Sequence, residues 1–141
     1  SRFVHFEFFR LTEAKTGLGA VGDYVGLEVN MRPAGGYTMD MTNFAHSTDV
    51  YEIWADMITA NRRLLPDCGI HCCCAYAGRR DFHRYVHTHE EILSRYADSI
   101  VMCERLPEVM WPQMGNQMYM AKLRDQEETD AFIRFVQERV K

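Results

Sequence analysis

Two segments near the start of the chain show the alternation of side chains that is typical of β-strands. Residues 3–11 are rich in aromatic side chains, and a loop with three glycines over residues 12–23 separates them from residues 24–32. The second segment places apolar and polar side chains on opposite faces: Leu27, Val29 and Met31 against Glu28, Asn30 and Arg32. The pattern predicts a β-hairpin that ends at Pro33 and the glycines that follow it.

The rest of the chain alternates between predicted helices and strands. Apolar residues at helical spacing predict a helix over residues 48–64 and a final helix after Asp125. Thr88 and Glu91 have the spacing of a capping box, which predicts the start of another helix. Strands are expected at residues 70–77, 82–86, 99–103 and 117–123, with a proline-containing loop at residues 107–116.

These elements predict an α+β fold in which a mixed or antiparallel sheet carries flanking helices. A length of 141 residues fits one domain or two small lobes, and we divide the chain into residues 1–64 and an appended α+β lobe of residues 65–141. An apolar alternating segment already starts at Phe3, and no Met precedes Ser1. We therefore expect the chain to be a fragment of a longer protein.

Composition and charge narrow the possible functions. Apolar residues make up 47% of the chain, which is enough for a core, while the net charge is −4 and the basic residues are scattered. This distribution argues against a nucleic-acid surface, and no stretch approaches the roughly 20 apolar residues that span a membrane. The cysteines are odd in number and three are adjacent (Cys68, Cys72, Cys73, Cys74 and Cys103). We expect reduced thiols and a cytoplasmic location.

The strongest chemical signal lies on the polar face of the second predicted strand. Glu28, Asn30 and Arg32 are two residues apart, so their side chains are expected about 6 to 7 Å from one another along one face. A carboxylate and an amide oxygen are the hard ligands that Mg²⁺ prefers. A guanidinium one step further suits a phosphate or acyl-phosphate oxygen.

Glu7 joins this face if the two predicted strands pair in antiparallel fashion. Two neighbouring carboxylates repel each other unless a cation lies between them. Gly35 and Gly36 then offer backbone amides to an anion, because glycine permits close approach. The alternative interpretation is that alternating polar residues form only the solvated face of an antiparallel sheet.

The segment from Leu27 to Gly36, preceded by residues 5–9, resembles the end of the ATP-grasp fold. This superfamily includes carboxylate–amine ligases, carbamoyl-phosphate synthase, biotin carboxylase and D-alanine–D-alanine ligase. The resemblance is specific over about residues 3–60 and weak thereafter. It implies that the positions matching the family's metal ligands are Glu7, Glu28 and Asn30.

The resemblance also implies a reaction and its cofactors. Mg²⁺ or Mn²⁺ would be held against the phosphates of ATP, Arg32 would steady the transferred phosphoryl group or acyl phosphate, and Gly35 and Gly36 would border the substrate. The partners would be ATP and small carboxylate and amine substrates. The nucleotide-gripping subdomain of the family would lie upstream in the parent chain, so this fragment alone should not turn over ATP.

Two other classes of protein remain as alternatives. Residues 65–141 are one candidate for a non-catalytic interaction module, which would form a homodimer or cover the ligase core. The run from His71 to Cys74 suggests a small thiol or zinc protein, although structural zinc sites usually use spaced pairs of cysteines. Adjacent cysteines alternate between faces of a strand, which fits packing as small hydrophobic residues.

Overall fold

The computed structural model describes residues 3–64, 66, 69 and 71–140. Ser1, Cys68 and Ile70, the first residue of the strand expected at residues 70–77, lie outside the described residues. The chain divides into two compact units, one of residues 1–39 and 49–66 and the other of residues 40–48 and 67–141. The fold is α+β with antiparallel sheets, as the sequence predicts.

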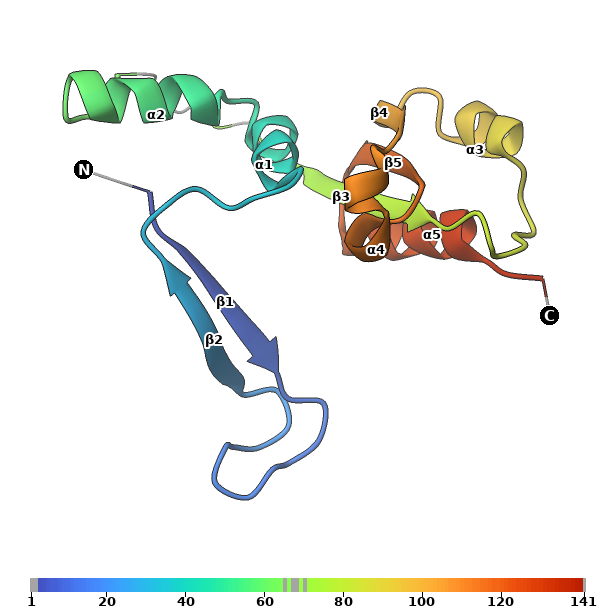
Figure 1. The fold of residues 1–141 in the computed structure, drawn as a ribbon, viewed down its shortest axis with the longest axis horizontal. Coiled ribbons are helices and arrows are strands. Elements are labelled where there is room, and N and C mark those ends of the chain that lie inside the picture. Colours follow the sequence, from blue (N-terminus) through green and yellow to red (C-terminus); the bar gives the residue numbers. More distant parts are fainter. Residues whose placement is uncertain (1–2, 65, 67–68, 70, 141) are drawn as a thin grey trace. The chain divides into compact units, whose positions relative to one another are not determined.

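A β-hairpin dominates the first unit. Strand β1 (His5–Arg10) pairs antiparallel with β2 (Tyr24–Asn30), and Figure 1 shows the long loop that joins them. Within the loop, an isolated bridge pairs Lys15 with Gly19. Helix α2 (Val50–Thr59) completes this unit, and the Asp49 side chain caps it by accepting from two backbone amides of its first turn.

A three-stranded sheet forms the centre of the second unit. Its order is β3 (Cys73–Arg79), β5 (Gln117–Leu123) and β4 (Ile100–Arg105), and both pairs are antiparallel. Helix α5 (Gln126–Gln137) contacts β3, and Figure 1 shows it against the sheet. Ala75, Ala77, Tyr119, Ala121 and Leu123 of the sheet pack with Ile92, Phe132 and Val136 of the helices to form the core.

Capping signals define the helices that the sequence predicts best. Helix α3 (His89–Arg95) begins with a complete capping box, in which Thr88 and Glu91 exchange hydrogen bonds with each other's backbone. Asp125 caps α5 by accepting from the Glu128 amide, but the Glu128 carboxylate turns to the backbone amide and guanidinium of Arg124 instead. The Asp125–Glu128 spacing is also that of a capping box, and at α5 this box is therefore only half formed.

Several predicted elements differ in the structure. The helix expected over residues 48–64 ends at Thr59. Residues 82–86 form no strand and contribute only the isolated bridge from Tyr85 to Arg139. Short helical turns, η1 (Glu108–Met110) and α4 (Trp111–Met114), replace the expected loop. Helix α1 (Thr38–His46) was not predicted, because its residues show little separation of apolar from polar positions.

Among the residues that the structure describes, no helix combines the length and the apolar character needed to cross a bilayer.

Candidate functional site

The register of the hairpin brings the predicted metal ligands to one face. Glu7 lies directly opposite Glu28, and His5 lies opposite Asn30. Side chains that oppose each other in an antiparallel pair have Cβ atoms about 4.5–5.5 Å apart. A bulge follows immediately, because the next residue, Phe8, pairs with Gly26 and skips Leu27. The two carboxylates and the amide of Asn30 therefore share a single polar face.

His5 is the residue of this face to which the sequence analysis gave no role. Its Nε2 atom lies 3.1 Å from Asn30 Nδ2 and 3.4 Å from Glu7 Oε1. Its Nδ1 atom lies 3.1 Å from the backbone oxygen of Arg32. The imidazole thus connects β1 to Asn30 of β2 and to Arg32 just after it, and it also contacts Glu7 of its own strand. Its place beside Glu7 in the alternation was the signal that could have identified it.

The protonation of His5 decides which of these contacts is favourable. An Nδ1–H that donates to the Arg32 carbonyl leaves Nε2 as an acceptor in the neutral ring, which suits the Asn30 amide. A protonated ring instead donates from Nε2 to Glu7 and requires the oxygen of Asn30 to turn towards it. The face therefore holds either a neutral histidine or a histidine–carboxylate pair.

Arg32 and the glycines lie just beyond this face. The Arg32 guanidinium is exposed and donates through Nη1 to the Pro33 carbonyl at 3.0 Å. Gly36 has a φ of +59°, which favours glycine, and it leads into the first turn of α1. Space around Gly35 is open, since an added Cβ would meet no atom within 4 Å. This loop is accessible to a ligand.

A mostly apolar cavity of about 220 Å³ adjoins the same loop. Residues of the loop and of helices α1 and α2 line it: Pro33, Ala34, Gly36, Met39, Val50, Tyr51 and Trp54. Val50 is buried, whereas Tyr51 and Trp54 are about half exposed. The cavity offers space for an apolar group. Arg32 immediately precedes Pro33, the first residue of the cavity lining.

The donor set of the polar face fits a hard divalent cation in its chemistry. Glu7, Glu28 and the Asn30 oxygen are the ligand types that Mg²⁺ accepts. Among the described residues, however, no three His, Cys, Asp or Glu side chains are grouped closely enough to hold a metal ion. The predicted ligands thus share a face without forming a closed coordination shell.

The opposite face of the hairpin is apolar and exposed. Phe6 is paired with Val29 across the strands, and both side chains are more than half exposed. Leu27, Met31 and Phe8 are exposed to a similar extent. Contiguous apolar surface of this kind typically marks a surface that contacts another protein segment.

Part of the cysteine run packs against the core of the second unit. The described cysteines Cys72, Cys73, Cys74 and Cys103 are free thiols. Cys73 packs against the core, and burial together with the neighbouring Cys72 raises the pKa of Cys74 to about 11. His71, which precedes this run, lies with its Nδ1 atom 2.8 Å from that of His46.

Comparison of the chain with protein-family models, with curated proteins and with solved structures gives no match.

Proposed function

We propose that this chain is the metal- and phosphate-binding part of an ATP-dependent ligase of the ATP-grasp type, which joins a carboxylate to an amine or a thiol. One observation carries the proposal: the hairpin register sets Glu7 against Glu28 and brings Asn30 onto the same face. An ordinary solvated face does not need two carboxylates directly opposite each other, because such a pair is destabilising. A cation between them removes that cost.

Each residue of the face has a role in this proposal. Glu7, Glu28 and Asn30 would hold Mg²⁺ or Mn²⁺, and the bound ion would offset negative charge on the phosphates of ATP. Arg32 would orient the transferred phosphoryl group or the acyl phosphate by donating from its exposed guanidinium. The backbone amides at Gly35 and Gly36 would border the substrate, and the adjoining apolar cavity would receive its side chain.

The remaining parts of the proposal concern the whole protein. The nucleotide-gripping part would come from an upstream segment of the parent chain, and the fragment alone would be inactive. The parent would act in the cytoplasm on small carboxylate and amine substrates, without nucleic acid or membrane partners.

Phosphate release from MgATP by the parent protein tests this proposal. Release that depends on a carboxylate and an amine, and that disappears in Glu28→Gln and Asn30→Ala, is the expected result. Glu13→Gln is the matched control, because Glu13 lies in the hairpin loop and pairs only with Lys15 among the described residues. Equal turnover in wild type and Asn30→Ala would contradict the proposal.

A second candidate is a non-catalytic interaction module that forms a homodimer or covers a larger enzyme. The exposed apolar face of the hairpin favours it, because Phe6, Leu27 and Val29 are more than half exposed. Light scattering of the chain at increasing concentration distinguishes the two. Self-association that Phe6→Ser and Val29→Ser abolish would support the module, and a strict monomer would count against it.

A further inference from the structure

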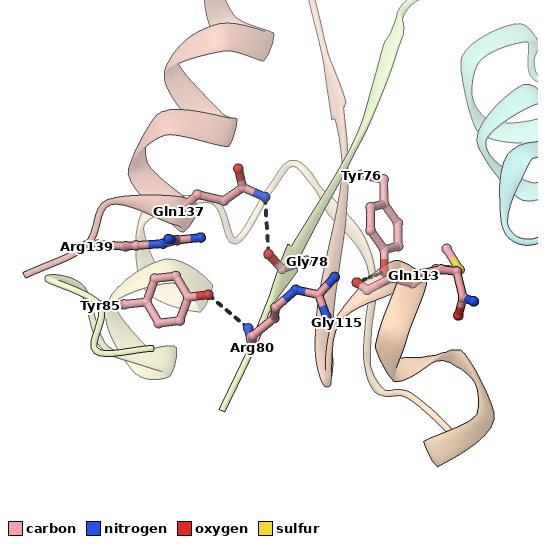
Figure 2. Close-up of a pocket in the computed structure, with 9 residues that line it drawn as sticks. Tyr76, Gly78, Arg80, Tyr85, Gln113, Gly115, Gln137 and Arg139 are labelled. Carbon is pink, nitrogen blue, oxygen red and sulfur yellow. Dashed lines mark hydrogen bonds between the residues drawn. The ribbon is translucent and has the colours of Figure 1, made fainter. Parts of the chain in front are cut away.

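Two cavities border the end of β3 in the second unit. They differ in whether the hydrogen-bond donors of their arginines are already occupied by other groups of the protein. The first has a volume of about 370 Å³, and Figure 2 shows Arg80, Tyr85, Gln137 and Arg139 around it. The Arg80 guanidinium has few donors left for a ligand, because it donates to the carbonyls of Trp111 and Pro112 at 2.8 and 2.9 Å. These hydrogen bonds satisfy the Arg80 guanidinium within the protein.

The second cavity has a volume of about 400 Å³ and is rich in cationic and hydrogen-bonding groups. The residues that line it are Arg79, Arg80, Asp81, His83, Tyr85, His89, Arg105, Gln117 and Tyr119. With both histidines neutral, three arginines and one aspartate give this lining a net charge of 3 − 1 = +2. Such a lining attracts anions.

Arg79 is the buried charge of this cavity. Only 8% of its surface is exposed. It donates from Nε to the Val136 carbonyl at 2.6 Å and from Nη1 to the His87 carbonyl at 2.8 Å. Its Nη2 atom is buried and has no hydrogen-bond partner within the described part of the chain. No carboxylate forms an ion pair with it among those residues either.

The surroundings of Arg79 compensate its charge only in part. The Val136 carbonyl belongs to the last turn of α5, where the helix dipole favours a cation. The Tyr85 ring lies 4.4 Å from the centre of the guanidinium and supplies a cation–π contact. Burial still lowers the pKa of Arg79. An arginine keeps its charge in proteins, and a buried charge without a counter-ion is costly.

The neighbouring groups can complete a site for an anion. The Tyr119 hydroxyl is buried and lies 2.8 Å from His89 Nδ1. If His89 donates in this contact, the Tyr119 proton remains available to a ligand. Arg105 forms a two-pronged ion pair with Asp81 at the exposed side of the cavity. That pair satisfies Asp81, so its carboxylate does not neutralise Arg79.

We propose that this cavity binds the oxyanion group of a small molecule, a carboxylate or a phosphate, with Arg79 Nη2 and the Tyr119 hydroxyl as its central donors. The bound oxyanion would supply the counter-charge and the acceptor that Arg79 lacks. This site lies wholly within the second unit and is independent of the ligase proposal. The Glu90 carboxylate, which acts on Tyr119 electrostatically, would disfavour anions of high charge.

Nuclear magnetic resonance of the full chain tests this proposal through the arginine Nε–H signals. Sodium phosphate and sodium acetate are titrated separately against sodium chloride at equal ionic strength. The expected result is a saturable shift of the Arg79 signal with at least one of the two oxyanions. A response to phosphate alone assigns a phosphate ligand, and a response to acetate alone assigns a carboxylate. No saturable shift with either would overturn the proposal.

Matched variants separate the site from general electrostatics. Tyr119→Phe keeps the buried ring and should weaken oxyanion binding roughly ten- to a hundredfold, the effect of losing one hydrogen bond to a charged group. Arg79→Lys should weaken it further. Arg134→Gln removes an exposed positive charge of α5 and should leave binding unchanged within about twofold. Equal weakening in Arg134→Gln and Tyr119→Phe would refute a specific site.

Discussion

Glu7 lies directly opposite Glu28 across the hairpin, and a bulge between Glu7 and Phe8 follows at once. The opposed pair places two acidic side chains where a sheet ordinarily places complementary ones. His5 approaches Glu7 to 3.4 Å and also contacts Asn30. The residues of the two strands therefore leave the negative charge of Glu7 and Glu28 on the polar face unbalanced.

We expect the hairpin to become more stable when one of these carboxylates is removed. Relief of a directly opposed like-charge pair is worth about 0.2–1 kcal/mol, so Glu28→Gln should slow hydrogen exchange of the hairpin amides by roughly 1.5- to 5-fold. In wild type, MgCl₂ should slow exchange beyond the effect of NaCl at equal ionic strength. Glu28→Gln should lose that difference, whereas Glu13→Gln should keep it. An Mg²⁺ effect that survives in Glu28→Gln would argue against a cation on this face.

The capping box of α3 gives a prediction about stability. Thr88→Ala removes the hydrogen bond to the Glu91 amide and should lower the free energy of unfolding by about 1 kcal/mol. Denaturant unfolding followed by Trp111 fluorescence in a Trp54→Phe background reports on the second unit. Thr88→Ser is the control and should retain most of the stability. A loss in Thr88→Ser as large as in Thr88→Ala would show that packing, not capping, is measured.

The features that the sequence predicted depend on local chemistry. Alternation over residues 24–32 fixes the polar face, and the Thr88–Glu91 spacing fixes the start of α3, because each is decided by neighbours in the chain. The short helices after Pro107 depend on contacts from elsewhere, including the hydrogen bonds from the Arg80 guanidinium to the carbonyls of Trp111 and Pro112. Local patterns do not encode such contacts.

The buried arginine illustrates the same limit at the second cavity. Arg79 follows Gly78 in what the sequence presents as a turn, and nothing nearby indicates burial. Its environment comes from α5 and from the segment before α3, which approach only in the folded unit. A candidate site assembled from several elements therefore could not be predicted, whereas the hairpin site could be, because its strands are adjacent in the chain.

Gly78 is required for the close approach of β3 to the end of α4. An added Cβ at this position would overlap the Met114 carbonyl oxygen, so Gly78→Ala should destabilise the second unit by about 1–3 kcal/mol. Thermal unfolding followed by Trp111 fluorescence measures this loss. Gly26→Ala in β2 is the control, since its Cβ would meet nothing within 4 Å, and it should leave the Trp111 transition unchanged. An unchanged transition in Gly78→Ala would show that the Met114 segment moves aside readily.

Tyr119 makes the stability of the second unit sensitive to alkaline pH. Desolvation raises the pKa of its hydroxyl from 10.0 to about 12, which the Arg79 charge only partly opposes. The folded chain then holds this proton more tightly than the unfolded chain, so the stabilisation is complete below pH 10 and is lost as the pH rises towards 12.

The size of this effect follows from the pKa shift. Two pKa units correspond to roughly 2–3 kcal/mol of unfolding free energy. Denaturant unfolding between pH 9 and pH 12, followed by Trp111 fluorescence, should show that loss in wild type and a distinctly smaller one in Tyr119→Phe. Tyr24→Phe is the control, because Tyr24 is 70% exposed and should not change the profile. Equal alkaline slopes in wild type and Tyr119→Phe would mean that Tyr119 ionises as readily in the folded chain as in the unfolded one.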